Sequence, residues 1–148
     1  MKITRPRLVV GTVIASAAAV LIPSAAAVAF ISPPLVMLAE AQSPARLVAG
    51  GAAVDVTVEY SCTADGMSLA VQVTEKVGKG IASGTGYTNV PCDGATHQVV
   101  VRAAANAAGR AFAAGSAATQ TDVSGCRFRS GHGFCGQDSI QRTIKIKK

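Results

Sequence analysis

The residue types best suited to chemistry lie between the last two cysteines, in the stretch CRFRSGHGFC at positions 126–135. Arginine and aromatic side chains are enriched at the energetic centres of protein interfaces. A disulfide that closes the stretch would hold it in one conformation and lower the entropy lost on binding. The stretch therefore predicts a binding loop, with the candidate contact residues Arg127, Phe128, Arg129, His132 and Phe134.

Two other interpretations of this loop stay open. In the first, the phenylalanines cap one end of the fold while the arginines keep the loop soluble. In the second, Arg127 or Arg129 enters the specificity pocket of an extracellular protease, and the chain acts as a protease inhibitor. A binding role is the leading hypothesis, and the inhibitor is its alternative.

Patterns typical of catalysis and of metal binding are lacking. The two histidines, His97 and His132, accompany no serine in a nucleophile elbow. Asp55 and Glu59 share one strand face with Thr57, and a solvated outer face explains these three better than a catalytic acid pair does. Neither cysteine pair has the spacing of a zinc ribbon, and the sequence contains no phosphate-binding loop. The sequence predicts a non-enzymatic protein with no metal site and no cofactor.

The four cysteines predict two disulfides and an oxidising compartment. We expect Cys62–Cys92 and Cys126–Cys135, because the second closes a compact loop and the first ties a strand to the middle of the domain. These closures would stabilise the fold by roughly 3.7 and 2.7 kcal/mol through chain entropy. The competing pair, Cys62–Cys126, has the spacing of an immunoglobulin inter-sheet bridge. However, it lacks the intervening tryptophan, and Ser124 replaces the usual tyrosine.

The N-terminus has the pattern of a secretory signal. Basic residues within the first seven positions are followed by no charge until Glu40. Ala39-Glu40-Ala41 fits a cleavage site, which predicts a signal peptide at 1–41 and a secreted protein. Cleavage at Ala25-Ala26-Ala27 ranks lower, because it would leave an apolar tail. Alternatively, residues 8–31 are long enough to span a bilayer as an apolar helix, which would anchor an outward-facing domain.

The charge of the chain limits its partners. The net charge is +6, and Lys145, Lys147 and Lys148 cluster at the C-terminus. This favours weak attraction to anionic polymers or membrane surfaces, although the tail would equally protect an edge strand from pairing. Nucleic acid is not expected, because the basic residues are too few to follow its backbone. The expected partner is an extracellular protein or an anionic envelope polymer, with membrane contact only through residues 8–31.

Alternating apolar and polar residues predict strands along most of the chain after position 52. In the clearest stretch, VDVTVEYSC, one face carries Val54, Val56, Val58, Tyr60 and Cys62. About seven such strands at 8–12-residue spacing predict an all-β domain at 52–148, preceded by a linker at 42–51. The expected fold is an antiparallel immunoglobulin-like β-sandwich, with a barrel as the lesser option. The chain has no tryptophan, which predicts a thin core that depends on its disulfides.

Three local expectations refine this fold. Residues 81–90 contain glycines and few large side chains, which predicts a strand at a sheet edge. Residues 103–108 predict a loop or a brief helical turn, because the run is too short for an independent helix. Phe112 is expected to plug the core, and the last strand is expected to place Ile140, Ile144 and Ile146 on one face.

Several stretches carry a family resemblance: VTVEYSC, VTEKVGKGIASGTG, CDGATHQVVV and the C-terminal cysteine pair. Together with the Ala/Gly/Val-rich composition, they resemble a group of small exported actinobacterial domains of unknown function. The resemblance covers most of the chain after the signal and is one of pattern. It implies an extracellular domain with no assigned activity and no site residues. The predicted function is an exported, disulfide-stabilised, non-enzymatic binding or structural module, outside the cell or at its envelope.

Overall fold

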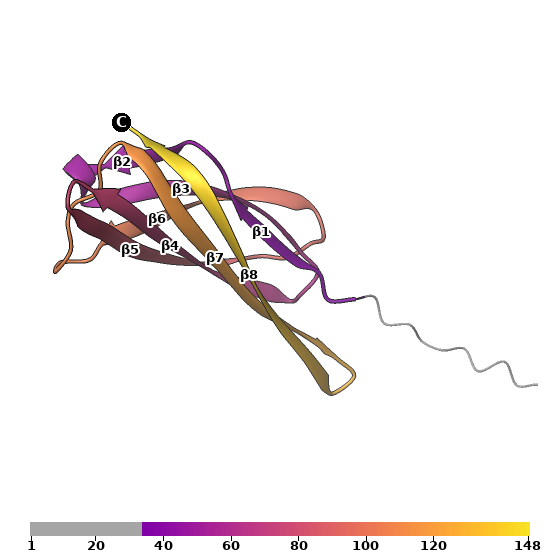
Figure 1. The fold of residues 1–148 in the computed structure, drawn as a ribbon. Coiled ribbons are helices and arrows are strands. Elements are labelled where there is room, and N and C mark those ends of the chain that lie inside the picture. The colour runs from indigo at the N-terminus through magenta and orange to yellow at the C-terminus, as the bar shows by residue number, and fades with distance from the viewer. Residues whose placement is uncertain (1–33) are drawn as a thin grey trace, which may run out of the picture. The chain divides into compact units, whose positions relative to one another are not determined.

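The computed structural model of the chain describes residues 34–148, so the predicted signal or anchor at 8–31 lies outside the described residues. The described chain is all-β (Figure 1). A 3-10 turn, η1 (Ala49–Gly51), joins the second and third strands. The strands are β1 (Met37–Ala41), β2 (Ala45–Val48), β3 (Ala53–Cys62), β4 (Gly66–Val77), β5 (Gly80–Val90), β6 (Thr96–Ala105), β7 (Gly115–Arg129) and β8 (His132–Lys147). Within 34–148, no helix is long and apolar enough to cross a membrane.

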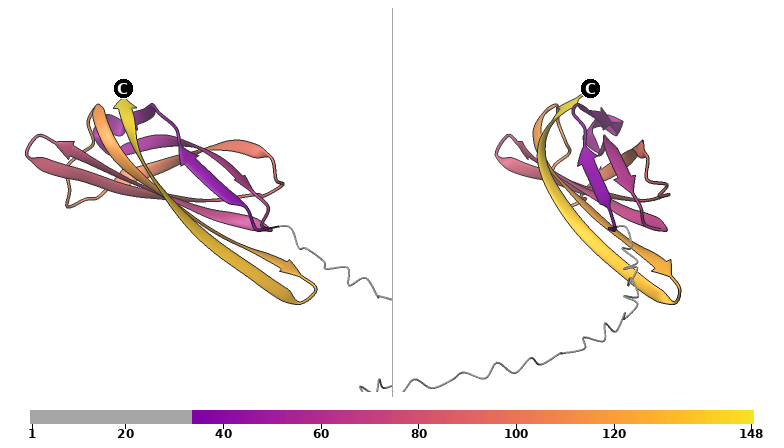
Figure 2. Two further views of the ribbon diagram at one scale, coloured as in Figure 1. Left: turned by 45° about the vertical axis from the view of Figure 1, so that its right-hand side comes forward. Right: turned by 90° about the vertical axis from the view of Figure 1, so that its right-hand side faces the viewer.

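Seven of the strands close into a barrel, and Figure 2 draws them from two further sides. Their order is β3-β2-β8-β7-β4-β5-β6, and β6 returns to pair with β3. The β2–β8 pair is parallel, and the other pairs are antiparallel. The predicted immunoglobulin-like sandwich is therefore wrong. A sandwich consists of two separate sheets, whereas these strands form one continuous hydrogen-bonded ring.

The core forms around β3, whose alternating residues point into the barrel as the sequence predicts. Val54, Val56 and Val58 are fully buried, and Cys62 is nearly so. They pack against the inward residues of β4, among them Leu69, and against other small apolar side chains. Phe112 belongs to the same core, which confirms that it plugs the barrel.

Strand β5 is not an edge strand, contrary to the prediction for residues 81–90. It lies between β4 and β6, and its inward face carries Gly84 and Gly86. A Cβ atom at Gly84 would lie 2.2 Å from the carbonyl oxygen of Ala104, and one at Gly86 would lie 2.3 Å from that of Arg102. The glycines are needed because the backbone of β6 passes directly over β5. Strand β6 also runs through Ala105, so the first half of the predicted loop at 103–108 is strand.

Replacing Gly84 with alanine should push the backbones of β5 and β6 apart. The new methyl group would collide with backbone, which cannot rotate away, so we expect Gly84→Ala to lower the free energy of unfolding by about 1–3 kcal/mol. Gly66→Ala is the matched control, because a Cβ there meets no atom within 4 Å. Urea unfolding followed by far-UV circular dichroism measures both changes. Equal stabilities of the two variants would contradict the close approach.

Strand β1 belongs to the folded domain. It pairs with the second half of β3 from Met37–Cys62 to Ala41–Val58, along the edge whose first half pairs with β2. The inward side chains Ala39 and Ala41 are buried. The predicted linker at 42–51 contains β2 and η1. Cleavage after residue 41 would remove β1 from this folded domain.

A charge introduced into β1 tests its place in the core. We expect Ala39→Asp to lower the free energy of unfolding by more than about 3 kcal/mol, because it buries an unpaired carboxylate. The neighbouring side chain of Leu38 is 55% exposed, so Leu38→Asp should cost less than about 1 kcal/mol. Both values come from denaturant unfolding of the purified variants. A small effect at both positions would mean that β1 contributes little to the stability of the fold.

Candidate functional site

The predicted loop at 126–135 is instead the end of a long β-hairpin. Strands β7 and β8 pair without interruption from Gly115–Ile146 to Arg129–His132, and their far end projects beyond the rest of the barrel (Figure 1). Ser130 and Gly131 form the two-residue turn with φ values of 48° and 81°, both positive as a type I′ hairpin turn requires. We call residues 126–135 the arm.

The arm is closed by a disulfide between two directly opposite residues. Cys126 pairs with Cys135 in the strand register and is bonded to it, while Cys62 is bonded to Cys92. Both predicted disulfides are therefore confirmed, and the competing Cys62–Cys126 pairing is wrong. Because the bond lies across the ladder, it holds the two strands together where few other elements support them.

The strand alternation divides the five candidate contact residues between the two faces of the arm. Phe128 lies on the outer face, opposite Gly133, and its ring covers that glycine: a Cβ there would be 2.8 Å from a ring carbon. Phe134 lies on the inner face opposite Arg127. The two rings are 68% and 56% exposed, respectively, whereas Arg127 is buried. Inner-face positions are also taken by Arg129 and His132, which pair next to the turn. The structure therefore brings four of the candidates to one face and sets Phe128 apart.

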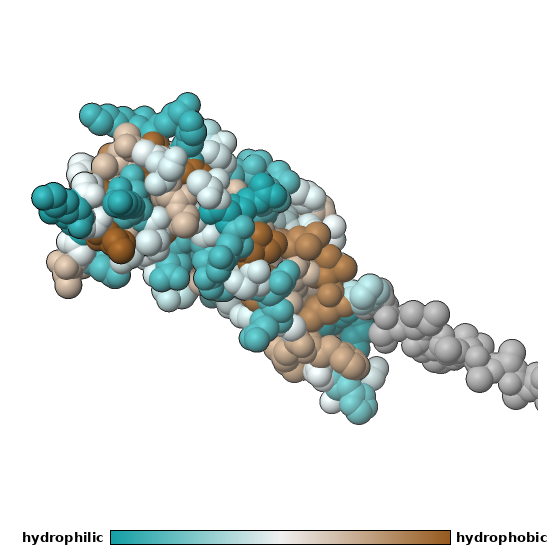
Figure 3. Space-filling model, in the orientation of Figure 1, coloured by the Kyte–Doolittle hydropathy of each residue, from teal (hydrophilic) through white to brown (hydrophobic). Residues whose placement is uncertain are grey.

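The base of the arm is fixed to the barrel by the segment between β3 and β4. The carboxylate of Asp65 accepts a hydrogen bond from the backbone N–H of Phe128 at 2.8 Å, and the Asp65 N–H donates to the carbonyl of Cys126 at 3.0 Å. On the inner side, the side chain of Met37 lies against Gly125 and Gly136. Figure 3 shows hydrophobic surface gathered over β1 and the adjoining part of the arm. The arm thus leaves the barrel from a rigid and partly apolar base.

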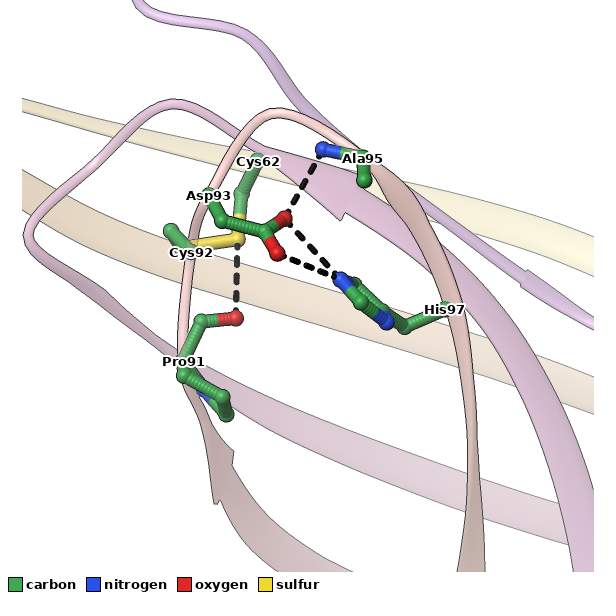
Figure 4. A network of polar contacts seen from close by, with 6 residues as sticks. All are labelled: Cys62, Pro91, Cys92, Asp93, Ala95 and His97. Carbon is green, nitrogen blue, oxygen red and sulfur yellow. Dashed lines mark hydrogen bonds and ion pairs between the residues drawn. A yellow bond between two sulfur atoms is a disulfide. The ribbon is translucent and has the colours of Figure 1, made fainter.

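The turn that carries Cys92 contains a compact polar network (Figure 4). The carboxylate of Asp93 accepts a hydrogen bond from the Ala95 N–H at 2.8 Å and lies 2.9 Å from Nε2 of His97. The Ala95 N–H, followed by the His97 contact, lowers the pKa of Asp93 below its usual value of 3.8. His97 also stacks at an angle on Tyr60, with ring centroids 5.7 Å apart.

This network orders a turn. The sulfur of Cys62 lies 3.8 Å from the carbonyl oxygen of Pro91. That approach is a contact and not a hydrogen bond, because a disulfide sulfur carries no proton. Asp93 and His97 hold the chain on the other side of Cys92. The arrangement positions the disulfide, and it presents no activated nucleophile among these residues.

Asp55 is buried, although the sequence assigned it to a solvated face. It stands between Arg46 of β2 and Arg102 of β6, its direct partners in the strand register. Arg102 donates two hydrogen bonds to it at 2.7 and 3.0 Å, and Arg46 donates one at 3.1 Å. The Arg102 hydrogen bond is the main cause of a lowered pKa of Asp55; burial opposes it, and Arg46 adds to it. The ion pairs join β2, β3 and β6 on the outside of the barrel.

Neutralising Asp55 should weaken the barrel in a pH-dependent way. We expect Asp55→Asn to lower the free energy of unfolding by about 1–2 kcal/mol at neutral pH, a modest loss because water screens the two exposed arginines. The folded-state pKa lies below the unfolded value, so this contribution is present above about pH 4 and disappears as the pH falls through the folded pKa. Urea unfolding between pH 2 and pH 7 measures it.

The control for that series is Glu59→Gln. Glu59 lies on the same strand and face but is exposed. Its replacement should change stability by less than about 0.5 kcal/mol. A constant difference between wild type and Asp55→Asn down to the lowest pH would contradict the ion-pair explanation.

Glu75 is a second buried carboxylate that sequence reasoning did not single out. It occupies an inward position at the end of the buried row on β4 and is 3% exposed. Its Oε2 atom accepts a hydrogen bond from the backbone N–H of Ala113 at 2.9 Å. The alternation that places Val73 inside also places Glu75 inside, so the signal was present in the sequence. Its observed role is to fix the segment that carries Phe112.

The described part of the chain, 34–148, holds no group of three or more His, Cys, Asp or Glu side chains that could bind a metal ion. We found no match to this chain among protein-family models, curated proteins or solved structures. The resemblance to exported actinobacterial domains therefore stays a prediction. Any functional conclusion depends on the geometry of the chain itself.

Proposed function

We propose that this chain is an exported, non-enzymatic binding module that presents its arm to a partner protein outside the cytoplasm. The observation that carries the proposal is the exposed ring of Phe134 on a disulfide-clamped hairpin that projects from a closed barrel. The two disulfides suit an oxidising compartment. The basic and then apolar N-terminus supports export to it.

The inner face of the arm has the composition of an interface centre. Phe134 offers a large apolar surface, and Arg129 and His132 flank it toward the turn. Strand pairing and the disulfide fix the backbone before binding, so association loses little backbone entropy. A partner that fits this face has an apolar hollow bordered by carboxylates. Such complementarity sets orientation as well as affinity.

The inhibitor alternative gains no support from the geometry. An inhibitor loop must present an extended segment to a protease, with the specificity side chain free to enter a pocket. Arg127 is buried, and Arg129 directly precedes the tight turn within the strand ladder. Neither arginine is displayed in the form that a protease active site accepts.

The arm is tested by comparing two exposed aromatic residues on different surfaces. We expect Phe134→Ala to weaken binding of the partner by about tenfold or more, because a central aromatic anchor contributes more than 1.4 kcal/mol. The partner is isolated from envelope and culture fractions by crosslinking to the tagged chain, and affinity is then measured with the purified pair.

Tyr87→Ala is the control, since Tyr87 is 79% exposed and lies on β5, away from the arm. It should leave the affinity for that partner unchanged. The proposal fails if both variants bind like wild type, or if both lose binding equally. Circular dichroism and a thiol assay establish that each variant is folded and oxidised.

A further inference from the structure

The outer surface of β5, β4, β7 and β8 is hollowed along its length. Three adjoining depressions of about 850, 630 and 330 Å³ lie on it. The first two share Ser68, Asn89, Ser124 and Gln137 in their lining. The third continues the hollow toward the other end of the strands, where its lining includes Gln72, Gln120, Gln141 and Arg142. We call this surface the outer groove.

The strand register arranges the outer groove into straight cross-strand rows. Ala70 separates Tyr87 from Asp122 in one row, and its short side chain leaves the floor low between them. Neighbouring rows repeat along the strands at intervals of about 7 Å, two residues apart. The rows are Asn89-Ser68-Ser124-Gln137, Tyr87-Ala70-Asp122-Ser139, Thr85-Gln72-Gln120-Gln141 and Ser83-Thr74-Ala118-Thr143.

The chemistry of these rows differs from that of the whole chain. The chain carries a net charge of +6, yet none of the row residues is a lysine or an arginine. Most of their side chains are hydroxyls and carboxamides, with two alanines, one carboxylate at Asp122 and one aromatic ring at Tyr87.

Asp138 and Arg142 also line the depressions from outside the rows, and Arg142 is paired with Glu40 at 2.7 Å. Cations begin only one row farther along the strands, at Lys76 and Lys145. The rows instead offer many neutral hydrogen-bond donors and acceptors.

Several of these side chains are already held in place by one another. Gln141 donates to Gln120 at 3.3 Å, and Gln120 donates to the carboxylate of Asp122 at 3.0 Å. Ser68 donates to the amide oxygen of Asn89 at 2.8 Å. A chain of oriented amides ending in a carboxylate can bind hydroxyl groups with little loss of side-chain entropy.

Tyr87 adds an apolar platform to this polar surface. Its ring is 79% exposed in the middle of a strand, a position that the barrel core does not require. The CH-rich face of a sugar ring packs on an aromatic ring, while the hydroxyls at its rim need donors and acceptors on both sides. Tyr87 with the amides and the carboxylate around it meets both needs.

We propose that the outer groove binds an uncharged polysaccharide. Charge selects this occupant: the carboxylates of Asp122 and Asp138 repel phosphate- or carboxylate-bearing polymers, and the one cation in the lining, Arg142, is already paired with Glu40. A hydroxyl-rich chain matches the repeated neutral donors and acceptors, and the length of the hollow suits a polymer better than a single sugar. The site is separate from the inner face of the arm, so the failure of one proposal would not affect the other.

Affinity electrophoresis of the folded chain tests the proposal. Native gels contain a neutral polymer, either barley β-glucan, galactomannan or dextran, or the anionic polymer alginate. We expect at least one neutral polymer to retard the wild type, in a manner insensitive to salt. Tyr87→Ala should weaken that binding by about tenfold, because it removes the stacking platform. Asp122→Ala should also weaken it, and Asp122→Asn should weaken it less because the amide still accepts hydrogen bonds.

Phe134→Ala is the matched control, since it removes an exposed aromatic ring from the inner face of the arm. It should leave the retardation unchanged. Failure of every neutral polymer to retard the wild type overturns the proposal. So does retardation that survives both Tyr87→Ala and Asp122→Ala, or retardation by alginate alone that salt abolishes. In the last case the basic surface, and not the groove, would be responsible.

Discussion

The barrel depends on hydrogen bonding along both edges of β3. One edge pairs with β6 over nearly its whole length, and the other pairs first with β2 and then with β1. Closure through the β6–β3 pair leaves the seven-stranded ring without a terminal strand. It also encloses the valine row of β3 from all sides. A core with no tryptophan is sufficient to stabilise the fold because β3, which carries the valine row, is covered completely.

The two disulfides act on different parts of this ring. Cys62–Cys92 ties the last residue of β3 to the segment that joins β5 and β6, within the support of the barrel. Cys126–Cys135 lies farther out, where β7 and β8 extend beyond most of the neighbouring strands. By chain entropy alone, the shorter loop contributes less stability to the fold. The greater effect of the second disulfide is local, because it keeps an exposed hairpin in register.

Sequence patterns predicted the strands well because side-chain alternation is a local property. They missed the barrel because closure depends on which strands meet at the ends of the chain, and the short parallel pairing of Ala45 with Ile146 has no sequence signature. Gly84 and Gly86 led to the prediction of an edge strand, whereas they mark the close approach of the β6 backbone to β5. The sequence placed Asp55 on a solvated face because its two arginine partners lie 9 and 47 residues away in the chain. The candidate loop was located correctly, but its division into two faces required the hairpin register.

The same register explains how one small barrel can carry two surfaces of opposite character. Along β7, even-numbered residues such as Asp122 face the outer groove, and odd-numbered residues such as Arg127 face inward. Where the barrel encloses β7, the inward residues are core. Beyond the barrel the same alternation continues, so the inward face of the arm becomes an exposed surface that borders apolar side chains. The outer groove and the arm face therefore lie back to back on shared strands, and a ligand on one leaves the other accessible.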